Sequence, residues 1–244
     1  MIYICIPAEN AEDTIGLLLW KIRVVMAEFG RDYEILVLDD ASTDRTRDVL
    51  EGYKSRLPLR ILRNDESAGE SAGLELLLRE AVISTKYPKR DSVVTLRSDF
   101  SDSPDAIIPL VRAIEGGSDI VAGTLKTEKV KSSFLVRIVR FLMEVLLGKV
   151  FYSAPVSDPL CGLRAYRLIV LKKAFNASSK RPLIASRGWL ANLELLSVLV
   201  PHARRVSEMA IDSSCQSGFY SSRYSVVGTF SNIRRVRQEI VWEN

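Results

Sequence analysis

Short β-rich runs alternate with helical segments along the first half of the chain, and this alternation restricts the fold more than any other feature. Strands are expected at residues 2–6, 33–38, 59–62, 92–96 and 119–124. The segments between them, including residues 104–114, repeat apolar residues at the spacing of an amphipathic helix. Alternating units of this kind build a mostly parallel sheet with right-handed crossovers. The chain is therefore predicted to have an α/β fold.

One domain with a C-terminal extension accounts for the length. The 244 residues suffice for one α/β domain with a large core, and no linker-like stretch divides them. The domain is expected at residues 1–211, and the extension at residues 212–244 carries a basic helix. An apolar share of 47% excludes a disordered or fibrous chain. The net charge of +4 favours an anionic substrate only weakly.

Neither an export signal nor a membrane anchor is expected. The chain passes from Met1 directly into a strand-like run, and no stretch reaches the ~18 uncharged apolar residues of a membrane span. Three scattered cysteines and one histidine predict neither a disulfide framework nor a zinc cluster, so a cytoplasmic location fits best. The arginines of the terminal helix are interpreted as a solvated face, and no nucleic-acid partner is expected.

Polar and acidic residues follow three of the predicted strands. Their sequences are PAENAEDT at residues 7–14, LDDASTDRT at residues 38–46 and LRSDFSDSPD at residues 96–105. In such sheets ligands bind beyond the carboxyl ends of the strands, so chemistry is expected here. Carboxylates such as Asp40 can accept hydrogen bonds from a ribose, and Asp99 with Asp102 could hold a divalent cation. Each loop also has a structural interpretation, because Asp, Ser and Thr commonly cap helices.

The order of these motifs resembles family 2 glycosyltransferases, most nearly the polyprenyl- or dolichyl-phosphate sugar transferases. The resemblance covers residues 1–211 and includes two further motifs, AGESAGLE at residues 68–75 and SDPLCGLRAYR at residues 157–167. It implies a GT-A fold, in which helices cover both faces of a Rossmann-like, mostly parallel sheet. It also implies an inverting sugar transfer from a UDP- or GDP-sugar to a polyprenyl-phosphate or glycan acceptor.

The same resemblance implies roles for particular residues. The positions expected beside the nucleobase and ribose are Pro7, Ala8, Glu9, Glu12 and Asp40. Asp99 matches the last Asp of the metal-binding Asp-x-Asp motif and is the expected ligand of a Mg²⁺ or Mn²⁺ ion. Asp158 and Arg164 match positions that flank the acceptor and the phosphates, and Asp158 is the candidate that deprotonates or positions the nucleophile. Its structural alternative is a turn residue before a proline.

Three positions depart from the family pattern, and all concern the diphosphate. Arg97 stands where the first Asp of Asp-x-Asp is expected, while Leu125 and Gln216 stand where arginines are usual. In one interpretation the Arg97 guanidinium contacts the diphosphate in place of a metal, with further charge from Lys126 and Arg223. In the other, the chain is a catalytically degenerate module that serves as a scaffold or regulatory partner. A nucleotidyltransferase is a weaker third hypothesis, because no Gly-rich basic loop follows the first strand.

Residues 132–152 form an apolar segment with a narrow polar stripe. The stripe consists of Arg137, Arg140 and Glu144, and the whole segment is predicted to be one helix. Such a helix either packs in the core or a homodimer, or lies peripherally on a membrane and brings the site to a lipid-phosphate acceptor. Packing is favoured slightly, because the stripe carries few basic residues.

Overall fold

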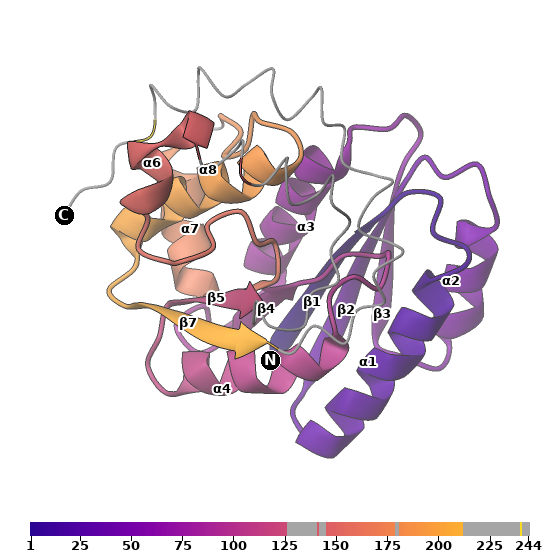
Figure 1. Ribbon diagram of the computed structural model, residues 1–244. Coiled ribbons are helices and arrows are strands. Elements are labelled where there is room, and N and C mark those ends of the chain that lie inside the picture. The colour runs from indigo at the N-terminus through magenta and orange to yellow at the C-terminus, as the bar shows by residue number, and fades with distance from the viewer. Residues whose placement is uncertain (126–140, 142–144, 179–180, 212–239, 241–244) are drawn as a thin grey trace.

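A seven-stranded sheet forms the centre of the molecule (Figure 1). The computed structural model describes residues 1–125, 141, 145–178, 181–211 and 240. The strand order is β3-β2-β1-β4-β6-β5-β7. Strand β6 runs antiparallel to β4 and β5, and the other paired strands run parallel. The prediction of a mostly parallel sheet is confirmed.

The elements of the first half match those expected from the sequence. The strands are β1 (Ile2–Ala8), β2 (Tyr33–Asp40), β3 (Leu59–Asn64), β4 (Ser92–Thr95), β5 (Ile120–Leu125), β6 (Arg164–Arg167) and β7 (Val206–Ile211). The helices are α1 (Ile15–Phe29), α2 (Thr46–Lys54), α3 (Glu70–Ser84), α4 (Ile107–Glu115), α6 (Lys149–Tyr152), α7 (Leu168–Ala177) and α8 (Trp189–Leu199). Short 3₁₀ turns, η1 (Pro104–Ala106) and η3 (Val200–His202), precede α4 and follow α8. All five predicted strands are present, each within two residues of its expected ends.

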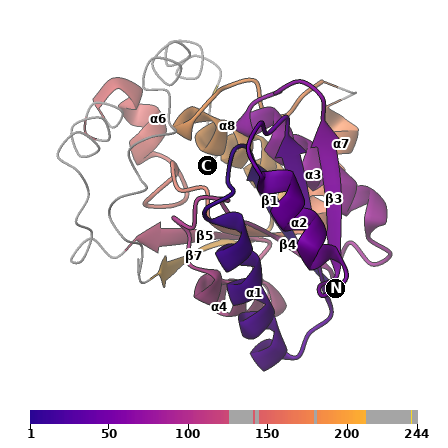
Figure 2. The same cartoon turned by 90° about the vertical axis from the view of Figure 1, so that its right-hand side faces the viewer.

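Helices cover both faces of the sheet (Figures 1 and 2). One core contains residues of α1, α2 and α4, and the other contains residues of α3, α7 and α8. Strand β1 contributes to both, since Ile4 and Ile6 lie in the first core and Tyr3 and Cys5 in the second. Successive side chains of a strand point to opposite faces. A strand covered on both sides must therefore be apolar throughout, as β1 is.

The second half contains elements that the sequence does not predict. None of the strands and helices expected above includes residues 164–177 or 206–211, where the structure forms β6, α7 and β7. Strand β6 is four residues long and is paired on both sides, with β4 and β5. Its conformation is therefore set by neighbours distant in sequence rather than by its own pattern.

The prediction of one helix over residues 132–152 is wrong at its C-terminal end. Gly148 adopts φ 50° and ψ −119°, which interrupts the helical backbone before α6. Glycine has no Cβ and takes such a conformation at low cost. The rest of that segment, apart from residues 141 and 145–147, lies outside the described residues. So do the predicted basic helix, apart from residue 240, and the positions Lys126, Gln216 and Arg223. Within the described part of the chain, no helix has the length and apolar character needed to span a bilayer.

Candidate active site

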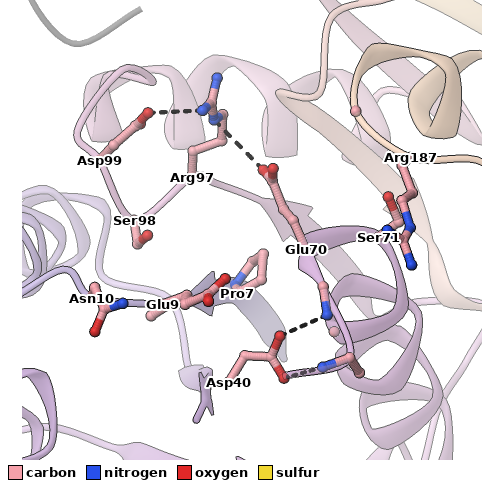
Figure 3. A pocket seen from close by; sticks show the side chains of 15 residues that line it. Pro7, Glu9, Asn10, Asp40, Glu70, Ser71, Arg97, Ser98, Asp99 and Arg187 are labelled. Carbon is pink, nitrogen blue, oxygen red and sulfur yellow. Dashed lines mark hydrogen bonds and ion pairs between the residues drawn. The ribbon is translucent and has the colours of Figure 1, made fainter. Parts of the chain in front are cut away.

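A cavity of about 460 Å³ lies beyond the carboxyl ends of β1, β2 and β4 (Figure 3). Its walls come from the loops after these strands, the start of α3 and the residues just before α8. Nine residues are expected from the sequence to bind the nucleotide sugar or to act as the base, and six of them line the cavity, namely Pro7, Ala8, Glu9, Asp40, Arg97 and Asp99. The structure does not bring the other three, Glu12, Asp158 and Arg164, to the cavity wall.

The loop after each of these three strands contains a residue with positive φ. The angles are 48° at Asn10, 56° at Ala41 and 58° at Phe100, and these are the non-glycine cases among the described residues. A side chain makes this backbone region unfavourable, so it persists only where surrounding contacts hold it. Strained positions of this kind cluster at ligand sites. Their gathering at one edge of the sheet supports a binding site there.

The loops after β1 and β2 are joined by hydrogen bonds. Asn10 Oδ1 accepts the backbone N–H of Thr43 at 2.9 Å, and its own N–H donates to Ser42 Oγ at 2.9 Å. The N–H of Ala11 donates to Thr46 Oγ1 at 2.7 Å. The polar residues that the sequence offers as helix caps therefore fix one loop against the other, and this fixes the cavity wall.

Glu12 takes part in the same junction rather than in the cavity. Its carboxylate accepts the backbone N–H of Arg45 at 2.9 Å and the Nε–H of the same residue at 3.2 Å. Its own N–H donates to Asp44 Oδ2 at 3.1 Å. The described contacts of Glu12 thus support the start of α2 and not a nucleobase.

Asp40 ties the end of β2 to the start of α3. The side chain is 2% exposed and accepts four hydrogen bonds, from Asn64 Nδ2 (2.6 Å), Ser67 Oγ (3.0 Å) and the N–H groups of Ala68 (3.0 Å) and Gly69 (2.8 Å). Burial acts to raise the pKa of Asp40, but these hydrogen bonds outweigh it, and the pKa is lowered. The carboxylate also lies at the N-terminus of α3, where the helix dipole favours negative charge.

Replacing Asp40 with asparagine is expected to lower the free energy of unfolding by about 2 kcal/mol near pH 7, because a neutral amide oxygen replaces a buried, multiply bonded carboxylate. Since the folded-state pKa is lowered, the ionised group stabilises the fold above its unfolded-state pKa. This contribution is lost as pH falls through the folded-state value. Urea unfolding of both proteins between pH 7 and pH 2.5 measures the difference, which should shrink at acid pH.

The control for this experiment is Asp65→Asn, because Asp65 is an exposed carboxylate in the loop between β3 and α3. It should change stability by less than about 0.5 kcal/mol. Equal effects of the two substitutions, or a difference that persists unchanged at pH 2.5, would contradict the assigned role of Asp40.

Arg97 and Asp99 form an ion pair within the cavity (Figure 3). Arg97 Nη2 lies 2.8 Å from Asp99 Oδ2, and the two side chains are 14% and 7% exposed. Arg97 Nε lies 3.6 Å from Glu70 Oε1, and the other oxygen of Asp99 accepts the N–H of Ser101 at 3.0 Å. The guanidinium therefore stands beside the carboxylate that the family motif assigns to a metal, and it neutralises that charge.

Asp102 lies behind this pair and accepts the backbone N–H of Arg97 at 3.0 Å. Burial raises the pKa of Asp102 to about 6, with Arg97 acting to lower it and Asp99 acting to raise it further. This carboxyl group therefore begins to bind a proton just below neutral pH. Metal ligation requires the deprotonated form, so Asp102 is a weak ligand at mildly acid pH.

These residues do not fit a divalent cation. An arginine offers no lone pair to a metal, and the Asp99 carboxylate is contacted by the guanidinium on one oxygen and by a backbone N–H on the other. No three His, Cys, Asp or Glu side chains of the described residues are grouped so that they could hold a metal ion. Mg²⁺ requires near-octahedral oxygen coordination, which this donor set does not provide.

Arg164 and Asp158 lie in the core rather than at the cavity. Arg164 is 0% exposed, and its Nη1 and Nη2 donate to the carbonyl oxygens of Asn192 and Pro159, both at 2.6 Å. Asp158 is 3% exposed and accepts the N–H of Leu160 at 3.3 Å. Arg164, expected to flank phosphates, instead joins the turn before β6 to α8. The described contact of Asp158 fits the turn interpretation.

Two charged residues of the cavity were not singled out from the sequence, Glu70 and Arg187. Glu70 falls within the AGESAGLE motif, so the motif itself could have identified it. Arg187 follows no predicted strand and belongs to no quoted motif. Its place depends on how residues 181–188 are folded against α3 and α8.

Comparison with known proteins identifies a family. The model of the family described as Glycosyl transferase family 2 matches residues 3–175. The undecaprenyl-phosphate 4-deoxy-4-formamido-L-arabinose transferase of Edwardsiella ictaluri is 27% identical over 83% of this chain and 60% of its own length. The dolichol-phosphate mannosyltransferase of Pyrococcus furiosus is 27% identical over 69% of this chain and 47% of its own. The chain thus spans about half to two thirds of the length of such relatives.

Solved structures share the fold at low sequence identity. Glucosyl-3-phosphoglycerate synthase from Mycobacterium tuberculosis, in complex with Mn²⁺, UDP and phosphoglyceric acid, has a TM-score of 0.64 and 18% identity, with 100% of this chain and 80% of that chain covered. Staphylococcus aureus TarS in complex with UDP-GlcNAc has a TM-score of 0.58 and 17% identity, with 99% and 68% covered. The predicted GT-A fold is confirmed by this likeness and by the strand order.

Proposed function

Because the chain belongs to glycosyl transferase family 2, we propose that it transfers a sugar from a UDP- or GDP-sugar to a polyprenyl-phosphate or glycan acceptor with inversion. One observation carries the proposal: the cavity lies at the carboxyl edge of β1, β2 and β4 and is lined by five residues that the family motifs single out and by Arg97. The names of the undecaprenyl- and dolichol-phosphate transferases support the lipid phosphate as acceptor. The proposed catalytic domain comprises residues 1–211, the last of which ends β7.

In the proposed reaction, an acceptor oxygen attacks the anomeric carbon on the face opposite the leaving group. The bond between that carbon and the diphosphate oxygen breaks, and its electron pair leaves with the nucleoside diphosphate. A phosphate acceptor is already anionic and needs only positioning, whereas a hydroxyl acceptor must give its proton to a base. Asp158 remains the proposed base, and its action would require a rearrangement that exposes its buried carboxylate.

We also propose that Arg97 takes the part of a metal ion at the diphosphate. A guanidinium keeps its charge at physiological pH and presents its donors in a rigid fork that matches phosphate oxygens. The ion pair with Asp99 supports this proposal, because it already places a fixed positive charge against the expected metal ligand. The alternative, a catalytically degenerate module that acts as a scaffold or regulatory partner, is compatible with the same ion pair and predicts no turnover.

Calorimetric titration with UDP, GDP and their sugars, each in EDTA and in Mn²⁺, tests the proposal. We expect binding of at least one nucleotide in EDTA. Release of nucleoside diphosphate above the rate of an Asp99→Ala control would count against the scaffold alternative, and absence of binding by every nucleotide would overturn the proposed function. Contact of residues 132–152 with a membrane stays a prediction, since most of that segment lies outside the described residues.

A further inference from the structure

A buried glutamate of α3 fixes the first part of the segment that precedes α8. Glu75 is 6% exposed, and its Oε2 accepts the backbone N–H groups of Leu183 at 2.8 Å and Ile184 at 3.0 Å. Its other oxygen is paired with Arg79 Nη2 at 2.7 Å, and this arginine also donates to the carbonyl oxygen of Arg181 at 3.3 Å. Helix α3 thus holds the segment through both partners of one ion pair.

A second glutamate, from α8, fixes the part that follows. Glu194 Oε2 accepts the N–H groups of Ala185 at 3.0 Å and Ser186 at 2.7 Å. Together the two carboxylates bind four consecutive backbone N–H groups, those of residues 183–186. Hydrogen bonds to a charged acceptor are stronger than neutral ones, so this backbone is firmly held.

The residue that comes next, Arg187, lines the cavity. Its side chain is exposed and extends from the segment toward the start of α3, where Ser71 lies (Figure 3). Within the described part of the chain, its guanidinium makes no hydrogen bond or ion pair. Gly188 follows with φ 63°, a conformation suited to glycine, and α8 begins directly after it. The backbone of residues 183–186, which the two glutamates fix, is thus followed directly by the Arg187 guanidinium at the edge of the cavity.

The cavity is lined by more carboxylates than guanidiniums, which bears on what Arg187 could bind. Four carboxylates line the cavity, those of Glu9, Asp40, Glu70 and Asp99. Of the two guanidiniums, that of Arg97 is already paired with two of these carboxylates. An anionic ligand entering a cavity with this excess of negative charge needs a compensating positive group, which Arg187 supplies.

We propose that Arg187 contacts a phosphate group of the ligand in this cavity, and that Glu75 and Glu194 are positioning residues for it. A guanidinium can form two parallel hydrogen bonds to the oxygens of a phosphate group. Because the backbone before Arg187 is already fixed, less conformational entropy is lost when the ligand binds. The proposal rests on the proposed function. The phosphate belongs either to the donor diphosphate or to a phosphate-bearing acceptor, and the two sources are separated by experiment.

The test compares wild type with Arg187→Ala and with Arg181→Ala, an equal loss of charge in the same segment at a residue outside the cavity wall. Each protein is titrated with UDP, with GDP and with geranyl phosphate, and geraniol serves as the phosphate-free probe. We expect Arg187→Ala to weaken binding of either the nucleoside diphosphates or geranyl phosphate roughly 10- to 100-fold. Arg181→Ala should bind as wild type does, and the affected ligand identifies the phosphate.

The outcomes separate this proposal from the proposed function. If wild type binds none of the phosphate probes, the proposed function is overturned and this proposal with it. If wild type binds a nucleotide and Arg187→Ala binds every probe equally well, only the role of Arg187 is overturned. If Arg181→Ala loses as much affinity for the phosphate probes, the effect comes from the overall charge of the segment, and the role of Arg187 is likewise overturned.

A double-mutant cycle tests the positioning role of Glu194. If Glu194 acts through Arg187, Glu194→Ala should weaken phosphate binding several-fold in the wild type but not further in Arg187→Ala. Glu194→Gln keeps an acceptor oxygen for the two N–H groups and should restore most of the affinity. A merely structural role would lower affinity equally in both backgrounds, and that result would overturn the positioning role.

Discussion

Replacing Arg164 with methionine is expected to lower the free energy of unfolding by about 3–5 kcal/mol, because two buried hydrogen bonds from a charged donor are lost, each worth about 1.5–3 kcal/mol. Methionine fills much of the volume but donates no hydrogen bond. The carbonyl oxygens of Pro159 and Asn192 would lose this donor in the core, and a buried carbonyl left without any partner costs about 1–3 kcal/mol. Urea unfolding at pH 7 measures the loss.

Unfolding and nucleotide titration of the Arg164→Met variant together decide between two roles for Arg164. If Arg164 binds phosphate, the substitution should lower nucleotide affinity with little effect on stability. If Arg164 is a core residue, the substitution should lower stability, and the protein that remains folded should keep its nucleotide affinity. Arg205→Met is the control, because Arg205 is exposed and lies just before β7. If Arg164→Met does not fold, Arg164→Lys keeps a charge without the fork and should show an intermediate loss. Unchanged stability with weakened nucleotide binding would restore the phosphate-binding role.

Arg164 also shows why the sequence does not predict the second half of the sheet. Strands β1 and β2 each contain a buried apolar run, so their pattern identifies them. Strand β6 has the sequence RAYR, with a charged residue at each end, and a local pattern assigns such residues to the surface. Its burial becomes favourable only when carbonyl groups of a turn and of α8 accept hydrogen bonds from Arg164. That compensation is a tertiary property.

Some residues of the candidate site could also be placed from the sequence, and others could not. Pro7, Asp40 and Asp99 could be placed together from the sequence, because the carboxyl ends of neighbouring parallel strands meet at one edge. Arg187 could not, because its position depends on Glu75, which is 108 residues from Leu183 in the chain. A long-range contact of this kind leaves no periodicity and no spacing that a local pattern can reveal.

Replacing Arg97 with aspartate is expected to convert metal-independent nucleotide binding into binding that requires a divalent cation. In EDTA, the variant loses a charge-assisted contact worth about 1.5–3 kcal/mol, so affinity for UDP or GDP should fall roughly 10- to 100-fold. The loss should be larger than that of Arg97→Gln, because the new carboxylate adds repulsion beside Asp99 and Glu70. Calorimetric titration of the three proteins measures this order of affinities.

Addition of Mn²⁺ distinguishes Arg97→Asp from Arg97→Gln. Mn²⁺ prefers hard, charged oxygen ligands, which an aspartate supplies and a neutral glutamine does not. With the guanidinium removed, Asp99 Oδ2 is released from its ion pair, and Arg97→Asp supplies a second carboxylate at the family spacing. Mn²⁺ should therefore restore binding to Arg97→Asp but not to Arg97→Gln, while wild type should bind equally with and without it. Strict dependence of the wild type on Mn²⁺, or wild-type affinity of Arg97→Asp in EDTA, would show that the Arg97 guanidinium does not take the part of the metal.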